Sequence, residues 1–507
     1  MWWATVALAS LGTSVVDLSA EMIEAAGPRA TGSEGAVEAQ RWVARELDAR
    51  GWSPSVLAGG SAYPTVYACR RGERRAVVLF LAHTDAVHPE VPGANDNAAA
   101  VAVLLKAIEK LPRRPTRTVC VAFPDAEEVG LLGSEVFARF TEKLGLGGRI
   151  DQVMALDLVG QGRLTHNGLG PAWGTAQLRW MMRHAPAEVP WVYRGVSWAW
   201  PHMERSDHRP FTERGVASSH LMARGPSGVY WAYHSREDTL DQLEPATLAQ
   251  AVRLVRKVAK APPLPKRGPD PAVVLPSGTV MPGRVVEGVT AVGLLALLAP
   301  LGADRSISWP LLHVVVGALA FGTALGLALA GRGLDQALAE PALLAAWCAW
   351  AAVWVGWPWP GSARSGRVLC GATALVAAGV WWWMGPILAL PLAISALAGV
   401  LVGRVPSGLL ALPALWPAGY FVRPDAVREL AFHGLLPASP WVWTLVHLFL
   451  TLPLVALVQG RALGRGRRRQ GLAAALAAAS VAAILWAWMS PEAAAPYLRP
   501  EVLWPQP

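Results

Sequence analysis

The pattern of hydrophobic and polar residues differs between the two halves of this 507-residue chain. Up to about residue 261, charged residues are spread among short apolar runs, as in a globular domain. From about residue 285 onward, long apolar runs are broken only by short stretches of Gly, Pro and Arg. A chain of this length is expected to form more than one domain, and the change in pattern places the main boundary near its middle.

In the first half, short apolar runs typical of strands alternate with stretches of helical periodicity. Strands are predicted at residues 65–69, 76–82 and 118–123, and helices at 97–111 and 247–260. An earlier helix is predicted between Thr31-Gly32-Ser33, which offers an N-terminal cap, and Gly51. The alternation predicts an α/β domain in which helices cover a sheet.

The second half is predicted to be an all-α membrane domain of about eight spanning helices at residues 285–490. Trp residues lie near the ends of the apolar runs, as in the interfacial belts of membrane proteins. The proline-rich residues 263–284 are expected to link this part to a first domain at 21–262, and residues 491–507 form a tail. Residues 1–20 are a short apolar start, which fits either a shortened signal anchor or a cover for the domain that follows.

The formal net charge of +9 does not indicate a nucleic-acid partner, because of where the basic residues lie. The densest cluster, five arginines between residues 461 and 469, separates two apolar runs, which is the arrangement expected beside a lipid bilayer. If this loop is cytoplasmic, nine arginines lie in cytoplasmic loops and three in the opposite loops. The positive-inside rule then places the first domain on the non-cytoplasmic side, periplasmic, extracellular or lumenal.

The four cysteines show no paired framework and no CxxC motif. They are Cys69, Cys120, Cys348 and Cys370. Cys120 lies in a strand-like run and the last two lie in predicted spans, so buried, inert thiols are expected. The redox environment of the protein stays open at this point.

Three apolar runs of the first domain end in residues that can bind metals. The runs are followed by His83 and Asp85, by Glu127-Glu128 and by Asp157. In α/β sheets, reactive groups collect beyond the carboxyl ends of the strands. Asp85 is close enough in sequence to accept the second ring N–H of His83 and so to fix its tautomer.

Two more residues complete a possible metal site. Asp96 precedes the helix predicted at 97–111, and a short loop keeps it near His83, which weakens the alternative that it only caps the helix. His234 lies in a loop before the last helix of the domain. The adjacent Glu127 and Glu128 would repel each other without a cation, whereas one could bind a metal while the other takes a proton from water. This mixed set of nitrogen and oxygen ligands suits zinc, with one carboxylate shared by two ions.

Five segments together resemble a known family. They are HTD (83–85), PGANDN (92–97), FPDAEEVGLLGS (123–134), SDHRPFTERGV (206–216) and YHSREDTLDQL (233–243). With the strand end at Asp157 they resemble the di-zinc aminopeptidase family that includes aminopeptidase Y and bacterial leucyl aminopeptidases, over most of residues 25–260. The multispanning second half is similar in architecture to the endoplasmic-reticulum metallopeptidase and vacuolar membrane protease type.

This resemblance implies a mixed central sheet flanked by helices and two Zn²⁺ ions per chain. Asp96 would bridge the ions. His83 and Asp157 would complete the coordination of one ion, and Glu128 and His234 would complete that of the other. Glu127 would be the general base and Asp85 would orient His83.

We therefore predict a membrane-bound zinc aminopeptidase that hydrolyses the N-terminal bond of peptide substrates. A glutaminyl-cyclase-like acyltransferase on the same fold is the nearest alternative, but such enzymes use a single zinc. A non-catalytic receptor or scaffold would be expected to have lost ligands or the base, and none is missing here. The oligomeric state stays open.

Overall fold

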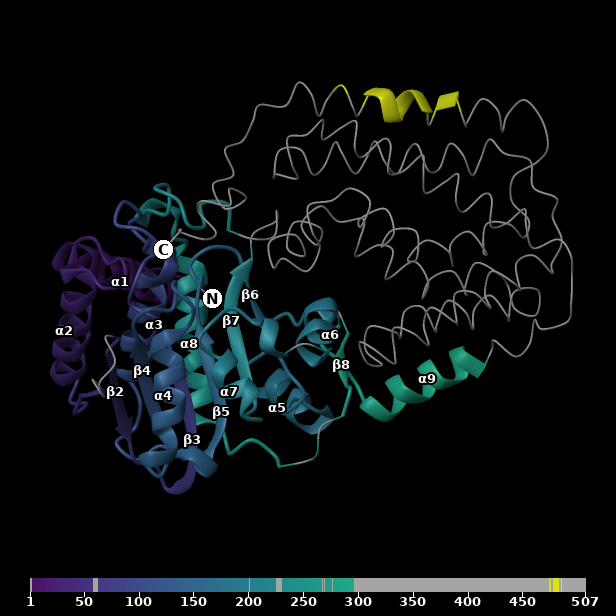
Figure 1. The fold of residues 1–507 in the computed structure, drawn as a ribbon, viewed down its shortest axis with the longest axis horizontal. Coiled ribbons are helices and arrows are strands. Elements are labelled where there is room, and N and C mark those ends of the chain that lie inside the picture. The colour runs from purple at the N-terminus through teal and green to yellow at the C-terminus, as the bar shows by residue number, and fades with distance from the viewer. Residues whose placement is uncertain are drawn as a thin grey trace, which may run out of the picture. The chain divides into compact units, whose positions relative to one another are not determined.

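The computed structural model of the protein describes residues 2–57, 63–199, 201–224, 230–266, 268, 270–275, 277–295, 474–475, 477–482 and 485. The chain divides into two compact units, residues 1–226 with 232–284, and residues 227–231 with 285–507. Most of the described residues belong to the first unit, whose helices and strands are labelled in Figure 1.

A seven-stranded mixed sheet forms the centre of the first unit, in the order β1-β2-β4-β3-β5-β7-β6. The strands are β1 (Ser55–Leu57), β2 (Thr65–Arg70), β3 (Arg74–Leu81), β4 (Arg117–Pro124), β5 (Ile150–Leu156), β6 (Arg163–Asn167) and β7 (Ser218–Arg224). The central strands β4, β3, β5 and β7 pair in parallel, and the outer pairs are antiparallel. The carboxyl ends of the four parallel strands therefore meet at one edge of the sheet.

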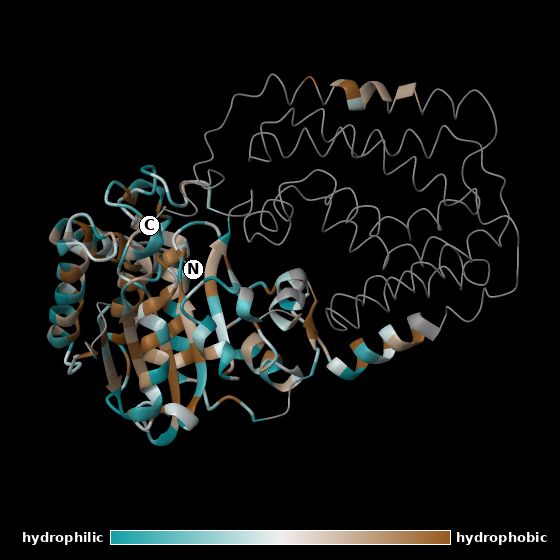
Figure 2. Ribbon diagram, viewed as in Figure 1, coloured by the Kyte–Doolittle hydropathy of each residue, from teal (hydrophilic) through white to brown (hydrophobic). Residues whose placement is uncertain are grey.

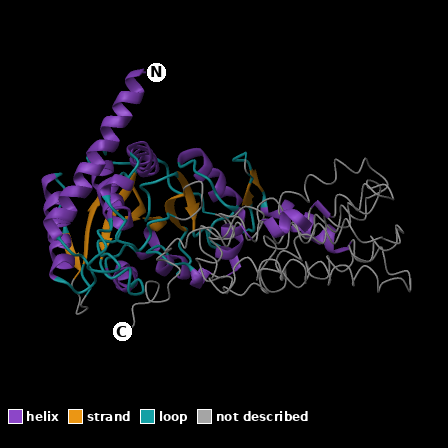
Figure 3. Ribbon diagram, turned by 90° about the horizontal axis from the view of Figure 1, so that it is seen from above, coloured by secondary structure: helices purple, strands orange, loops and turns teal. Residues whose placement is uncertain are grey.

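Helices cover both faces of this sheet, as Figure 3 shows from above. One face packs against α1 (Trp2–Ala26), α2 (Glu34–Ala49), α3 (Ala99–Ile108), α5 (Thr175–His184) and α8 (Pro245–Lys260). The other packs against α4 (Leu132–Lys143) and α7 (Arg209–Glu213). Because β3, β4 and β5 are buried on both faces over most of their length, each contains a continuous apolar run, and brown predominates in this part of the sheet in Figure 2. The first unit also contains α6 (Trp191–Ala199), and α9 (Gly283–Leu295) follows at its end.

These elements confirm the predicted α/β fold with a mixed central sheet. The strands β2, β3 and β4 and the helix α8 lie within two residues of their predicted bounds. Ser33 caps α2, because its side chain accepts a hydrogen bond from the backbone N–H of Ala36. The helix predicted from residue 97 begins later, because Asp96 and Asn97 have non-helical backbone angles within the turn Ala94–Ala98.

The apolar start of the chain forms α1, and the second half of this helix belongs to the core of the first unit. Val15, Leu18 and Met22 are buried among side chains of that core. Residues from Val15 onward therefore cover the domain. Within the described ranges, no helix is both long and apolar enough to cross a membrane. The spans predicted at 285–490 lie outside the described residues except for α9 and short stretches near residue 480.

The proline-rich segment predicted to be a linker is packed onto the first unit instead. It contains two short strands, β8 (Val273–Val274) and β9 (Val280–Met281), which pair with each other. Asp270 accepts hydrogen bonds from both the backbone N–H and the hydroxyl of Thr175 at the start of α5. The prolines restrict the backbone of this segment to an extended conformation, and its buried side chains pack against the domain.

Cys69 and Cys120 form a disulfide, which corrects the prediction of inert thiols. The two residues face each other across the antiparallel pair β2–β4, with their Cα atoms 4.1 Å apart. Cys120 is buried, whereas Cys69 is exposed. Because 51 residues separate the two cysteines, their spacing in sequence gave no sign of the pairing.

We predict that this disulfide is present in cells. After alkylation of free thiols in intact cells, digestion without reductant should give one cross-linked peptide that contains Cys69 and Cys120. Because the cross-link closes a loop of 51 residues, replacing both cysteines by Ser should lower the free energy of unfolding by about 2–4 kcal/mol, measured by pulse proteolysis in urea. Recovery of both cysteines in alkylated form would contradict the prediction.

Candidate metal centre

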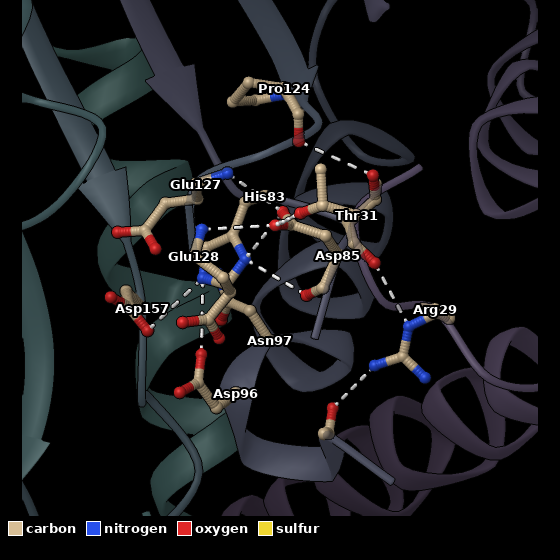
Figure 4. A network of polar contacts seen from close by, with 12 residues as sticks. Arg29, Thr31, His83, Asp85, Asp96, Asn97, Pro124, Glu127, Glu128 and Asp157 are labelled. Atoms are coloured by element: carbon tan, nitrogen blue, oxygen red, sulfur yellow. Dashed lines mark hydrogen bonds and ion pairs between the residues drawn. The ribbon is translucent and has the colours of Figure 1, made fainter. Parts of the chain in front are cut away.

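The structure brings all seven predicted site residues together at the carboxyl edge of the sheet, and Figure 4 labels all of them except His234. They are His83, Asp85, Asp96, Glu127, Glu128, Asp157 and His234. His83 follows β3, the two glutamates follow β4, and Asp157 follows β5, so three neighbouring parallel strands end at the site. The parallel order explains why residues far apart in sequence meet here.

Asp96 lies between the two histidines of the site. Its Oδ1 atom is 3.3 Å from Nε2 of His83, and its Oδ2 atom is 3.4 Å from Nε2 of His234. Oδ1 of Asp157 is 3.8 Å from Nε2 of His83, and Oε2 of Glu128 is 2.9 Å from Nε2 of His234.

These side chains form two groups that could each hold a metal ion. Donor atoms of His83, Asp96 and Asp157 all lie within 4.8 Å of one another, and so do donor atoms of Asp96, Glu128 and His234. Asp96 belongs to both groups. Glu127 joins a third group with His83 and Glu128.

The donor atoms of these groups fit a metal ion, because several are buried and lack a hydrogen-bond partner among the described residues. These atoms are Nε2 of His83, Oδ2 of Asp96, Oε1 of Glu128, Oδ1 of Asp157 and Nε2 of His234. Buried polar atoms are normally paired, so such a set indicates a partner that is not part of the chain. Imidazole nitrogen and carboxylate oxygen are the ligands that zinc takes in catalytic sites.

The electrostatics of the site also favour cations. Burial raises the pKa of Glu127 well above its usual value and raises that of Glu128 to about 7. Neighbouring carboxylates raise both pKa values further. Burial opposes protonation of His234, but Glu128 and Asp96 outweigh it and raise its pKa to about 10. Burial would likewise raise the pKa of Asp96, but the neighbouring imidazoles of His234 and His83 lower it. The carboxylates thus draw protons to the site, and bound cations would supply the same positive charge.

Backbone strain is concentrated next to the predicted ligands. Four described residues other than glycine have a positive φ: Ala126, Leu131, Leu158 and His234. Ala126 precedes Glu127, Leu158 follows Asp157, and His234 is itself a predicted ligand. The left-handed conformation costs a residue with a Cβ atom about 1–2 kcal/mol. Such strain is typical of functional sites, where it aims side chains.

Asp85 links both strand ends of the site. Its Oδ1 atom is 3.4 Å from Nδ1 of His83 and accepts a hydrogen bond from the backbone N–H of Glu127 at 3.2 Å. Its Oδ2 atom accepts from the backbone N–H of Glu128 at 3.1 Å and from the hydroxyl of Thr31 at 2.9 Å. Asp85 is therefore placed to orient His83, and it also fixes the backbone of the two glutamates. From its sequence neighbours, Thr31 was predicted only as part of a helix cap, and its contact with Asp85 was not predicted.

A second set of contacts holds the Asp96 loop. The carboxylate of Asp238 accepts hydrogen bonds from the backbone N–H groups of Asn95 and Asp96, at 2.8 and 3.0 Å. The buried guanidinium of Arg29 donates to the carbonyl oxygens of Pro92 and Gly93, and also to that of Thr84 next to His83. Arg29 and Asp238 thus tie the loop to the strand end and to the His234 segment.

Gly93 allows this close packing of the Asp96 loop. Its φ of +62° is unfavourable for other residues, and a Cβ atom there would lie 2.5 Å from the carbonyl oxygen of Asp96.

Comparison with known proteins agrees with this geometry. Residues 65–259 match peptidase family M28. Aminopeptidase YwaD of Bacillus subtilis (strain 168) is 30% identical to the chain over 185 residues, 35% of this chain and 39% of the relative. The chain thus spans well under half the length of this curated relative.

Among the solved structures that are similar to this chain are a glutaminyl cyclase and an aminopeptidase. A glutaminyl cyclase from an Acidobacteriales bacterium matches with a TM-score of 0.41 and 18% identity, over 49% of this chain and 94% of the cyclase. The LapA aminopeptidase of Legionella pneumophila matches with a TM-score of 0.41 and 14% identity, over 52% of this chain and 72% of that chain.

We predict that the hydroxyl of Thr31 supports metal binding through Asp85. Thr31→Val removes the donor and keeps the shape of the side chain, so Asp85 should hold His83 and the glutamates less firmly. Zinc affinity, measured by competition with a chelator, should fall about tenfold. Thr31→Ser keeps the hydroxyl and is the matched control, with affinity close to wild type. Equal affinities for both variants and the wild type would contradict the role given to Thr31.

Proposed function

We propose that this chain is a membrane-bound zinc aminopeptidase that binds two Zn²⁺ ions and hydrolyses the N-terminal bond of peptide substrates. The observation that carries the proposal is the pair of ligand groups that share Asp96, with Glu127 beside them. The match of residues 65–259 to peptidase family M28 supports a peptidase. The name of the relative YwaD supports an aminopeptidase.

Each ion would be held by three residues of the chain. His83, Asp96 and Asp157 would hold one, and Asp96, Glu128 and His234 the other. When bound, the two ions would supply the positive charge that polarises the scissile carbonyl group and makes a water molecule acidic near neutral pH.

Glu127 is the residue best placed to move the proton of the attacking water. It lies within the third group with His83 and Glu128, and its backbone N–H is fixed by Asp85. Burial raises the pKa of Glu127, which suits a carboxylate that must accept a proton. Glu127 would take the proton as the water attacks and then give it to the amine that leaves, so that one side chain serves as base and acid.

The proposed location of the domain is the non-cytoplasmic side of a membrane. The excess of arginines in alternate loops of the apolar half supports this location. The disulfide between Cys69 and Cys120 supports it independently, because disulfides persist mainly in oxidising compartments. The alkylation experiment above tests this location too, since both thiols should be free in a cytoplasmic domain.

We predict that activity and metal binding can be separated by mutation. Glu127→Ala should keep the zinc content of the wild type but lower kcat about 10²–10⁴-fold, because only the proton acceptor is removed. Asp96→Ala should lose both activity and zinc, because Asp96 belongs to both ligand groups. The exposed Glu142 lies outside the site, so Glu142→Gln is the matched control and should behave as wild type.

The assay should use aminoacyl substrates, their N-acetylated forms and a peptide with N-terminal glutamine, with and without chelator. An aminopeptidase should cleave only the free-amine substrates, and zinc should restore activity after chelation. Near-full activity of Glu127→Ala would overturn its role as base. Cyclisation of the glutaminyl peptide without hydrolysis of any substrate would overturn the aminopeptidase proposal.

A further inference from the structure

A third histidine, His220, faces the proposed metal site. Its Nε2 atom is 3.7 Å from Oδ2 of Asp157, whereas the other oxygen of Asp157, Oδ1, is 3.8 Å from Nε2 of His83. The two oxygens of this carboxylate therefore face two different histidines. Among the described residues, no other Lys, Arg or His forms an ion pair with Asp157.

The strand pairing explains why His220 reaches Asp157. His220 lies on β7 and pairs with Ala155 on the parallel neighbour β5. The backbone N–H of Asp157 donates to the carbonyl oxygen of Leu221, which continues this register beyond the end of β5. Because alternate residues of a strand point to the same face, Asp157 and Ala155 project toward the face that carries His220.

His220 is itself held in place by a chain of polar side chains. Its ring stacks on that of His208, with centroids 5.7 Å apart and an interplanar angle of 27°. Nε2 of His208 is 3.4 Å from Oε2 of Glu204, and the hydroxyl of Ser197 donates to Oε1 of Glu204. Four side chains thus lead from α6 to Asp157.

The backbone at Gly168 lies close to the ring of His208. Gly168 has a φ of +65°, and a Cβ atom at this position would lie 2.0 Å from Nε2 of His208. Only glycine allows the backbone to approach the ring this closely. His208 is fully buried, so it forms a rigid support for the ring of His220.

We propose that His220 is a positioning residue for Asp157 and thereby sets the affinity of the metal position formed by His83, Asp96 and Asp157. The inference rests on the two-metal site of the proposed function. The imidazole of His220 lies beside Oδ2 of Asp157 and would keep Oδ1 turned toward His83. The second position, with Glu128 and His234, does not involve His220. The two positions are therefore expected to respond differently to loss of this ring.

The test compares the zinc content of full-length variants at a series of buffered free zinc concentrations, with zinc alone as the probe. His220→Ala should keep one ion at wild-type affinity and bind the other about 10–100-fold more weakly. His220→Gln retains a side-chain N–H donor and should recover part of that affinity. If thermal unfolding shows that His220→Ala does not fold, the His220→Gln variant alone tests the proposal.

His166→Gln is the matched control. His166 is a buried histidine on β6, where it pairs with Leu221, and its ring bonds the carbonyl oxygen of Ala185. Its loss should leave both zinc affinities unchanged, whereas a general effect of removing a buried histidine would change them in this variant too.

The outcomes separate this inference from the proposed function. If the wild type binds two ions and folded His220 variants bind both with unchanged affinity, the role of His220 is wrong and the two-metal site stands. If both positions weaken equally, His220 has only a structural role and the inference is again overturned. If the wild type itself binds fewer than two ions, the two-metal site fails, and the inference fails with it.

Discussion

Four carboxylates and two histidines are gathered in the protein interior where β3, β4 and β5 end, and their negative charge has to be balanced. Burial of unbalanced charge is costly, and neighbouring carboxylates add mutual repulsion. Burial first and neighbouring carboxylates second raise the pKa of Glu127 and Glu128. Carboxylates also raise the pKa of His234 despite its burial, so the site carries an excess of negative charge. Two divalent cations would remove it, and the remaining features of the site keep the carboxylates in place for those cations.

Contacts between distant parts of the chain hold the ligands in that arrangement. Asp85 joins the end of β3 to the backbone after β4, and Thr31 supports Asp85 from the segment before α2. Asp238 holds the Asp96 loop from the other side, next to His234. The ligands are thus fixed by polar contacts that depend on the complete fold, so the site and the fold of this domain form one cooperative structure.

The sequence was sufficient to predict the strands that carry the site, because β3, β4 and β5 are buried on both faces and read as apolar runs. Two runs end directly in His83 and Asp157, and Glu127 follows the third run after a short turn, so the same apolar runs indicated both the strands and the site. The strand order was not available from these runs. Contacts that depend on it were therefore missed, namely the disulfide across β2–β4 and the approach of His220 on β7 to Asp157.

Other differences have local physical causes. Proline content predicted a linker at 263–284, and buried residues such as Ala272 and Val273 pack this segment against the domain. The cap predicted at Thr31-Gly32-Ser33 is formed by Ser33, and the hydroxyl of Thr31 donates to Asp85 instead. The contact of Thr31 could not be predicted, because its partner lies 54 positions away in sequence.

The central claim is that Asp96 lies between two metal ions. Anomalous diffraction at the zinc absorption edge, from crystals of the zinc-loaded protein, tests it most directly. We expect two peaks about 3.5–4 Å apart, one beside His83 and Asp157 and one beside Glu128 and His234, with Asp96 in contact with both. A single peak, or a second peak that lies away from Asp96, would contradict it.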